Sequence, residues 1–146
     1  MKITNAKAFH DYEIGDRFEA GISLYGSEVK ALREGHADLT ASYVRIRDGQ
    51  AYLINARIFL YKYARPDGYE EARTRKLLLH KKEIISLKSK IEGMSLTIVP
   101  LSLYDKNRLI KAELALAKGK KKFDKKQALK RKDMNRDIQE ALKNTR

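Results

Sequence analysis

The 146-residue chain contains no cysteine. This absence excludes disulfide bonds, thiolate metal sites and cysteine nucleophiles. The first residues, MKITNAKAFHDYEIGDRF, lack the apolar core of a secretory signal peptide, and no apolar run reaches the roughly 20 residues that span a membrane. We therefore expect a protein of the reducing cytoplasm that does not cross a membrane.

Histidine is scarce as well, because His10, His36 and His80 are the only three and lie far apart in the sequence. The chain has no H-E-x-x-H zinc motif, no phosphate-binding loop and no nucleophile elbow. Glu28, which follows Ser27 at the start of a predicted helix, is explained better by the helix dipole than by acid–base chemistry. We expect no enzyme activity, no catalytic residue, no metal site and no cofactor.

Positive charge is abundant, with 32 Lys and Arg against 19 Asp and Glu and a formal net charge of +13. Residues 118–146 hold 12 of these basic residues and 4 of the acidic ones, so this fifth of the chain contributes +8. Such an excess indicates polyanionic partners and says little about the fold. We predict a mildly basic folded domain over residues 1–117 and a strongly basic tail over residues 118–146.

Alternation of apolar and polar residues predicts about six short strands. They occupy residues 18–24, 43–47, 50–54, 73–79, 95–103 and 109–117, with a loop at 61–72 and a turn at 105–108. Asp48 and Gly49, between the second and third strands, form a strong hairpin signal. In the first strand the alternation directs Phe18 and Ala20 inward and Glu19 outward.

The fourth predicted strand ends in three leucines that cannot all share one face. Its simplest phase places Leu77 and Leu79 inward. Lys76 and Leu78 then face outward, and the same phase extends to His80. The alternative is that all three leucines belong to the core and that His80 caps the following helix.

Two short helices interrupt the strands. The first follows Ser27, a candidate N-cap, and ends at Gly35; the second carries Ile84 and Leu87 three apart and ends at Gly93. Because strands and helices do not alternate regularly, we predict a mainly β fold with accessory helices. A small closed antiparallel barrel of the oligonucleotide-binding (OB) type is the natural architecture. An open sheet packed on helices has the same periodicity.

The chain changes character after Gly119. Residues 118–126, KGKKKFDKK, contain six lysines in nine positions. Asp124, followed three residues later by Gln127, resembles a capping box. Because the sparse apolar residues that follow would bury little surface, we expect residues 119–142 to be largely unfolded in the free protein. We expect a helix from Asp124 once an anionic partner is bound.

Six motifs occur in the order found in one protein family. They are NAKAFHDY, FEAGISLYGSEVKALREG, SYVRIRDG, RTRKLLLHKKEI, VPLSLYDKN and LAKGKKKFDKK. From about Asn5 to Lys126 the chain therefore resembles the SsrA-binding protein family, also called small protein B. The resemblance implies an OB-type barrel that binds the tRNA-like domain of transfer-messenger RNA in bacterial ribosome rescue.

The resemblance also implies further partners. The RNA complex is expected to enter the vacant A site of a stalled ribosome, where the tail lies in the empty mRNA path against small-subunit ribosomal RNA. Elongation factor Tu is a further partner, reached through the shared RNA.

Residue by residue, the resemblance assigns two sets of RNA contacts. The set that binds transfer-messenger RNA is Asn5, Lys7, His10, Tyr12, Glu19, Lys76, Leu78 and His80. The set that lies in the mRNA channel is Gly119, Lys120, Lys121, Phe123, Asp124, Lys125 and Lys126. In the channel the lysines would bind phosphates, Phe123 would stack on a base, and Asp124 would start the helix.

Three positions depart from the family pattern. Ala6 and Phe9 stand where the family often has arginine, which removes two phosphate contacts. Lys126 replaces the family's last arginine, and it keeps the charge but loses the planar fork that grips phosphate.

The assigned residues fit RNA chemistry, but each has a simpler alternative. Glu19 can accept hydrogen bonds from base edges, and it can equally be a solvated glutamate paired with a lysine. Leu78 can pack under an unstacked base, and His80 can stack or donate. For the whole chain, the rivals are a general single-strand nucleic-acid binder with aromatic platforms and an RNA-processing enzyme. The enzyme would need a carboxylate cluster or a His/Lys pair.

Overall fold

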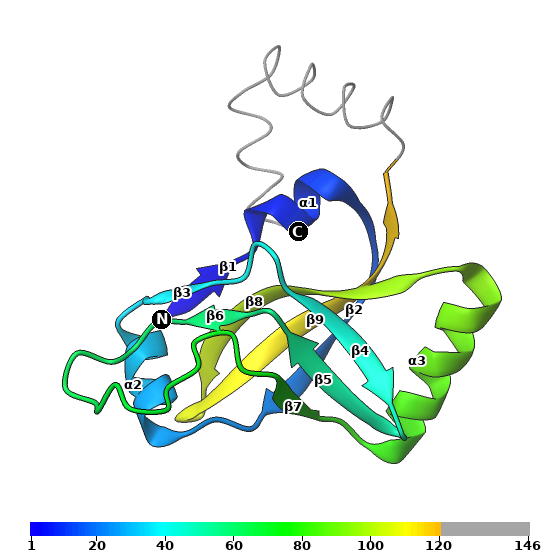
Figure 1. Cartoon of the computed structure of the whole chain (residues 1–146). Coiled ribbons are helices and arrows are strands. Elements are labelled where there is room, and N and C mark those ends of the chain that lie inside the picture. The colour runs from blue at the N-terminus through cyan, green and yellow to red at the C-terminus, as the bar shows by residue number, and fades with distance from the viewer. Residues whose placement is uncertain (121–146) are drawn as a thin grey trace, which may run out of the picture.

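A computed structural model of the chain describes residues 1–120. The predicted tail helix, and with it Lys121, Phe123, Asp124, Lys125 and Lys126, lies outside the described residues. The described part contains nine strands and three helices (Figure 1). In chain order these are β1 (Lys2–Thr4), α1 (Ala6–Asp11), β2 (Tyr12–Ile22), α2 (Gly26–Arg33), β3 (Ala37–Asp38), β4 (Tyr43–Arg47), β5 (Gln50–Ile54), β6 (Arg57–Ile58), β7 (Arg75–Leu78), α3 (Lys81–Met94), β8 (Thr97–Lys106) and β9 (Leu109–Gly119).

Six strands form a ring through backbone hydrogen bonds. Their order is β8-β4-β5-β7-β2-β9, and β9 pairs back onto β8. Every pairing in the ring is antiparallel, and β1 adds a further strand beside β8. The prediction of a mainly β fold with accessory helices is confirmed. The ring pairs the edges of these strands, which would otherwise expose free backbone donors and acceptors.

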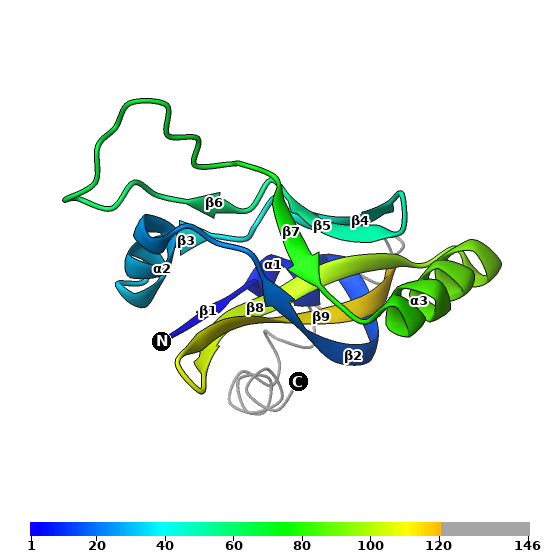
Figure 2. The same ribbon diagram turned by 90° about the horizontal axis from the view of Figure 1, so that it is seen from below.

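The interior of the ring is a compact apolar core. Its most buried leucines, each at most 1% exposed, are Leu32, Leu53, Leu77, Leu103 and Leu114. Helix α2 contributes Leu32 to this core, and α3 contributes Leu87. The two helices lie at opposite ends of the ring, as two perpendicular views agree (Figures 1 and 2).

A second, smaller core lies under α1 on the outer face of β8 and β9. Ala8 of α1 packs there with Val99, Leu101, Ala115 and Ala117. Sequence periodicity did not predict this helix, because six residues are too few to show an apolar repeat.

Strand β2 begins six residues before the predicted segment 18–24. Its pairing with β9 shifts between Ile14 and Arg17, where β2 holds one residue more than its partner. A Cβ at Gly15 in this bulge would lie 3.1 Å from a backbone oxygen of β9, which glycine avoids. The bulge breaks the apolar alternation, so periodicity missed this half of the strand. It also keeps Ile14, Arg17 and Glu19 on one outer face.

Several predicted turns match the structure closely. The β4–β5 hairpin agrees residue for residue, and Asp48 (φ 52°) and Gly49 (φ 72°) take the left-handed conformation of a two-residue hairpin turn. Gly35, with φ 78°, follows the end of α2 as predicted. The β8–β9 turn is tighter than the four residues predicted, because Asn107 and Arg108 alone, both with positive φ, connect the strands.

Two helix boundaries were predicted wrongly. Helix α2 takes Tyr25 as its N-cap, two residues before Ser27, because the backbone N–H of Tyr25 is satisfied by a side chain of the first turn. Helix α3 runs through Gly93 to Met94. Ser95, with φ 52°, provides the left-handed residue that ends it.

The folded part extends slightly beyond residue 117. Gly119 still pairs with Tyr12, and the backbone N–H of Lys120 donates to the Asp11 carbonyl oxygen over 3.0 Å. The loop at 61–72 contains no strand, as predicted, and the short β3–β6 pair precedes it. Among residues 1–120, no helix combines the length and apolar character needed to cross a membrane.

Candidate nucleic-acid interface

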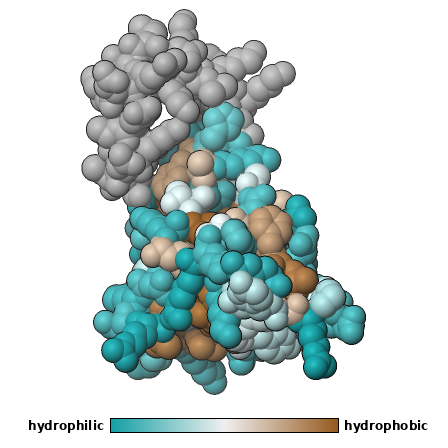
Figure 3. Space-filling view, turned by 90° about the vertical axis from the view of Figure 1, so that its left-hand side faces the viewer, coloured by the Kyte–Doolittle hydropathy of each residue, from teal (hydrophilic) through white to brown (hydrophobic). Residues whose placement is uncertain are grey.

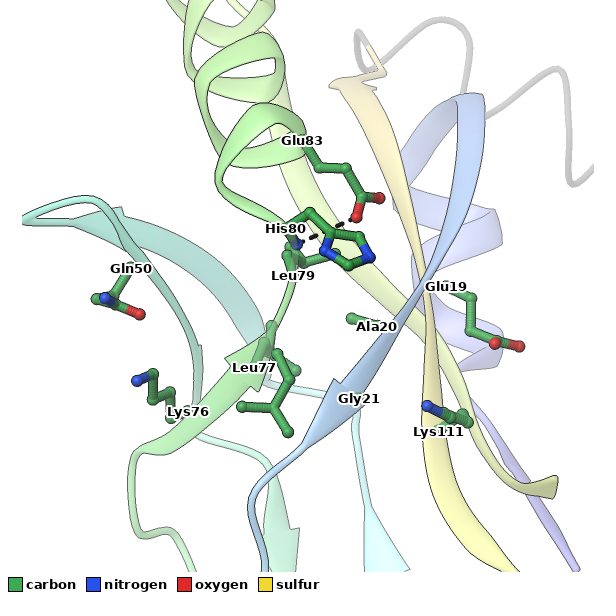
Figure 4. A pocket seen from close by; sticks show the side chains of 11 residues that line it. Glu19, Ala20, Gly21, Gln50, Lys76, Leu77, Leu79, His80, Glu83 and Lys111 are labelled. Carbon is green, nitrogen blue, oxygen red and sulfur yellow. Dashed lines mark hydrogen bonds between the residues drawn. The ribbon is translucent and has the colours of Figure 1, made fainter. Parts of the chain in front are cut away.

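Four residues of the predicted RNA-binding set line one open hollow of about 400 Å³ on the outer surface. They are Glu19, Lys76, Leu78 and His80. The hollow lies where β2 and β7 meet the start of α3 (Figure 4). Its remaining lining residues are Ala20, Gly21, Gln50, Leu77, Leu79, Glu83 and Lys111. Residues far apart in the sequence therefore converge here.

Leu78 faces outward, as the simplest strand phase predicted. Its side chain is 54% exposed, whereas Leu77 is 1% exposed and Leu79 is partly buried against the core. The alternative in which all three leucines are core is therefore wrong for Leu78. Across the pairing with β2, a Cβ on Gly21 would lie 3.1 Å from the Leu78 Cβ, so glycine makes room for this leucine. An exposed leucine in a polar hollow offers an apolar contact to a base.

His80 occupies the N-cap position of α3, but its side chain does not cap the helix. Its backbone N–H instead donates to the Glu83 carboxylate over 3.1 Å (Figure 4). The exposed imidazole ring points toward the β2 side of the hollow (Figure 4). Both sequence interpretations therefore hold in part, because the residue begins the helix while its ring remains available to a ligand.

Glu19 lies on the outer face of β2 and is held by two residues of β8. Its carboxylate accepts a hydrogen bond from the Tyr104 hydroxyl, and the Lys106 ammonium lies 3.3 Å from both oxygens. The hydrogen bond from Tyr104 has the largest effect and lowers the pKa of Glu19. Burial opposes it, but Lys106 and Lys111 lower the pKa further, so that it lies below its ordinary value. The group is ionised and can only accept hydrogen bonds. The lysine pairing matches the simpler alternative, although the carboxylate remains exposed beside the hollow.

Asn5 is committed to the fold. The residue is 4% exposed. Its side-chain oxygen accepts a hydrogen bond from the Ala8 N–H, and its side-chain amide donates to the Pro100 carbonyl oxygen over 2.9 Å. Asn5 therefore starts α1 and ties it to β8. Sequence comparison alone could not separate this role from direct contact with RNA.

Lys7, His10 and Tyr12 form a second group at the other end of β2. Lys7 is exposed, the His10 Nδ1 lies 2.8 Å from the Asp11 carboxylate, and Tyr12 packs partly against the small core. Tyr12 and Glu19 are seven positions apart in β2, which corresponds to about 20 Å along a strand. The structure therefore brings the predicted RNA-binding residues together in two groups on the outer surface.

The start of the tail lies beside the α1 group. Gly119 pairs with Tyr12, and the Lys120 ammonium donates to the Phe9 carbonyl oxygen in the last turn of α1 over 3.2 Å. A lysine is favoured there by the negative end of the helix dipole. These two members of the predicted channel set are thus built into the edge of the folded part.

A buried ion cluster was missed by the sequence interpretation. Glu28 is 1% exposed and its two oxygens accept from Arg73 over 2.6 Å and from Arg75 over 2.7 Å. Burial raises the pKa of Glu28, but hydrogen bonds from Arg73, the Tyr25 N–H and Arg75 outweigh it and hold the pKa below its ordinary value. The strand phase that buries Leu77 also buries Arg75, and this signal could have revealed the cluster.

Two further residues line the hollow but were not predicted from the sequence. Lys111 and Gln50 line it from β9 and β5, and no short-range signal connects them to β7.

Within residues 1–120, no group of three or more His, Cys, Asp or Glu residues could hold a metal ion.

The chain is similar in sequence to proteins of one known family. The chain matches the family model described as SmpB protein over residues 2–144. The SsrA-binding protein of Sulfurihydrogenibium sp. (strain YO3AOP1) is 55% identical over 140 residues, covering 96% of this chain and 92% of the relative. That of Geotalea uraniireducens (strain Rf4) is 50% identical over 139 residues, with coverages of 95% and 92%.

A solved structure is similar as well. It is described as "tmRNA-SmpB: a journey to the center of the bacterial ribosome", and one of its chains matches with a TM-score of 0.69 and 46% identity. The match covers 83% of this chain and 85% of that chain.

Proposed function

This chain belongs to the SmpB protein family, and from that premise we propose that it is an RNA-binding factor of trans-translation. It binds the tRNA-like domain of transfer-messenger RNA (tmRNA) and acts with it on stalled bacterial ribosomes. It is an RNA-binding protein and not an enzyme, and it works in the cytoplasm. The observation that carries the proposal is the hollow, which gathers Glu19, Lys76, Leu78 and His80 from distant parts of the chain.

The chemistry of the hollow suits an RNA with bases turned out of their stack. Leu78 packs against the face of such a base, while His80 stacks beside it or donates to it. Lys76 and Lys111 supply positive charge for the backbone phosphates. This combination reads the shape of a folded RNA more than the sequence of a duplex.

Glu19 has a distinct part in this site. A carboxylate repels phosphate, but it accepts hydrogen bonds from the amino and imino groups of bases. Tyr104 and Lys106 hold the Glu19 carboxylate in one orientation, so little freedom is lost when a base binds.

The α1 group extends the contact to a second part of the same RNA. Lys7, His10 and Tyr12 take part directly, and Asn5 acts by holding α1 in place. Because Lys120 leaves the fold at the end of α1, the tail starts next to this contact.

The tail proposal rests on the family pattern. Residues Gly119–Lys126 enter the empty mRNA path of the ribosome and contact small-subunit ribosomal RNA, and the segment from Asp124 becomes helical there. Elongation factor Tu joins the complex through the shared RNA. The six-strand ring is assigned to the OB type, which is supported by its antiparallel pairing and by the position of α3 between β7 and β8.

The test compares two exposed apolar residues in a binding assay with the tRNA-like domain. Leu78→Ala is expected to weaken binding about tenfold, because an unstacked base loses an apolar contact worth roughly 1–2 kcal/mol. Ile85→Ala is the matched control, since Ile85 is 60% exposed on α3 and does not line the hollow. If the two variants bound the tRNA-like domain with equal affinity, the hollow would not be part of the RNA-binding site.

A further inference from the structure

Aromatic and basic side chains gather beside α2, on a flank that the proposed function leaves unused. We call this the α2 flank and define it as Tyr25, Lys30, Tyr61, Lys62, Tyr63 and Arg73. It lies at the end of the ring opposite α3, and hence away from the hollow (Figures 1 and 2). Figure 3 looks onto this side of the molecule, which shows mainly hydrophilic side chains with small apolar areas between them.

The first part of the flank is a continuous row of two rings between two cations. The Lys30 ammonium lies 5.7 Å from the centre of the Tyr61 ring, and the Lys62 ammonium lies 5.0 Å from that of Tyr63. The two rings meet edge to face, with centres 5.5 Å apart. Tyr63 is 77% exposed, so most of its ring is open to a ligand.

The second part is one exposed ring on a fixed cation. The guanidinium of Arg73 lies 4.2 Å from the centre of the Tyr25 ring, and Tyr25 is 63% exposed. Arg73 is itself held at 2.6 Å by the buried carboxylate of Glu28. Because the cation cannot swing away, the ring is presented in one position, and little freedom is lost when a ligand stacks on it.

The charges of this flank favour an anionic ligand. The carboxylates of Glu28 and Glu71 are neutralised by ion pairs with Arg73 and Arg57. By contrast, the ion pairs found within residues 1–120 include neither Lys30 nor Lys62. Within residues 1–120, two ammonium groups therefore stand next to the exposed Tyr63 ring and the partly buried Tyr61 ring without an acidic partner of their own.

This pattern is the one that single-stranded nucleic acid requires. Bases stack on aromatic rings while neighbouring cations bind the phosphates between them. A duplex hides the faces of its bases, and an apolar peptide needs a continuous apolar surface, which the interleaved charges interrupt.

We propose that the α2 flank is a second RNA-binding surface, which holds unpaired nucleotides while the hollow at the other end holds the tRNA-like RNA. The identity of the first RNA and the choice of the ribosome as the source of the second RNA rest on the proposed function.

The test uses the full-length protein saturated with the tRNA-like domain and a fluorescein-labelled, unstructured RNA of twelve nucleotides. Tyr63→Ala, and separately Tyr25→Ala, are expected to weaken binding of the labelled RNA about five- to tenfold in fluorescence anisotropy. Tyr63→Phe keeps the ring and should bind normally. Met94→Ala removes a side chain that is 65% exposed in the last turn of α3, and it should also bind normally.

The tail also attracts RNA, but it is the same in every variant. Its contacts are ionic, so they weaken as salt is raised, whereas the loss caused by Tyr63→Ala should persist. Binding unaffected by Tyr63→Ala would overturn the proposal, and so would displacement of the tRNA-like RNA by the labelled strand. If the wild-type protein fails to bind the tRNA-like RNA, the proposed function fails, and the labelled strand is then titrated into the protein alone.

A cross-linking experiment separates RNA from protein as the ligand. A photoreactive phenylalanine introduced at Tyr63 is expected to cross-link to ribosomal RNA in purified ribosomes. Cross-links to ribosomal proteins alone would show that the flank binds another class of partner, and the proposal would be wrong.

Discussion

The two faces of strand β7 use similar residues for opposite purposes. On the inner face Arg75 is fully buried and bonds to Glu28 and to the carbonyl oxygens of Ala56 and Arg73. On the outer face the adjacent Lys76 is exposed and lines the hollow. The number of basic residues in the sequence is therefore larger than the number of cations that RNA can contact. Burial within the fold decides which basic residues bind phosphate and which hold the protein together.

The leucines of the same strand show the same division. Leu77 is 1% exposed and fills the ring, whereas Leu78 is 54% exposed and lines the hollow. Neighbouring residues of identical chemistry thus differ in function because a strand turns successive side chains to opposite faces. Substitutions on one face should change stability, and substitutions on the other should change RNA binding.

The largest effect is expected from Arg75→Leu, compared with Lys76→Leu. Loss of Arg75 leaves the buried Glu28 carboxylate with Arg73 as its only cationic partner, which should lower the free energy of unfolding by about 3–5 kcal/mol. Lys76→Leu should lower it by less than about 0.5 kcal/mol but weaken RNA binding. Urea unfolding followed by circular dichroism measures the first quantity. Equal losses of stability would contradict the division between the faces.

The second-largest effect is expected on RNA binding, from the loss of Glu19 on the outer face of β2. Glu19→Ala should weaken binding of the tRNA-like domain by roughly 1–3 kcal/mol if this carboxylate accepts from a base edge. Glu113 is the matched control, because it lies directly opposite Glu19 on β9. Removal of its negative charge should leave affinity unchanged or slightly increased in a gel-shift assay at fixed salt. Tighter binding by Glu19→Ala would show that this glutamate only repels RNA.

A smaller effect concerns the pH dependence of the inner face. Hydrogen bonds from the arginines hold the pKa of Glu28 below its ordinary value of 4.5, although burial acts in the other direction. The ionised form is therefore favoured by folding, and its stabilisation is complete above pH 4.5 and lost as the pH falls through the lowered pKa. Thermal unfolding between pH 6 and pH 3 should show this loss. Glu28→Gln should be less stable at neutral pH, and its stability should decline less over the same acidic range.

The smallest effect is expected from Gly21→Ala, because Gly21 of β2 pairs directly with Leu78 of β7. The added Cβ of Gly21→Ala would lie 3.1 Å from the Leu78 Cβ and 3.3 Å from one of its methyl carbons, so this leucine must shift. We expect RNA binding to weaken two- to threefold, which is less than about 1 kcal/mol, with little change in stability. Gly26→Ala is the control, since nothing lies within 4 Å of a Cβ placed there. Equal binding by both variants would show that the position of Leu78 is not critical.

Local patterns predicted the parts of the fold that local chemistry controls. The β4–β5 hairpin follows from Asp48-Gly49, and the outward direction of Leu78 follows from alternation along one strand. Helix α1 could not be predicted in this way, because its stability comes from packing on β8 and β9 and from the Asn5 cap. The bulge near Gly15 was likewise hidden, since it exists only in relation to β9.

The residues of the candidate site also fall into those that the sequence could predict and those that it could not. The motif around Leu78 and His80 could be assigned from its resemblance to a family and its strand phase. Lys111 and Tyr104 could not, because they approach Glu19 and the hollow only through pairing with strands far away in the sequence.

The sequence by itself determined the β-rich class, the hairpin turn at Asp48-Gly49 and the concentration of positive charge after residue 117, because these depend on neighbouring residues. Only the tertiary structure decided which charges remain available. It buried Arg75 against Glu28, which lies 47 positions away, and it brought Tyr104 to Glu19 across 85 positions. The physical reason is that hydrogen bonds and burial act between atoms that are close in space, and the closing of the strand ring sets those distances.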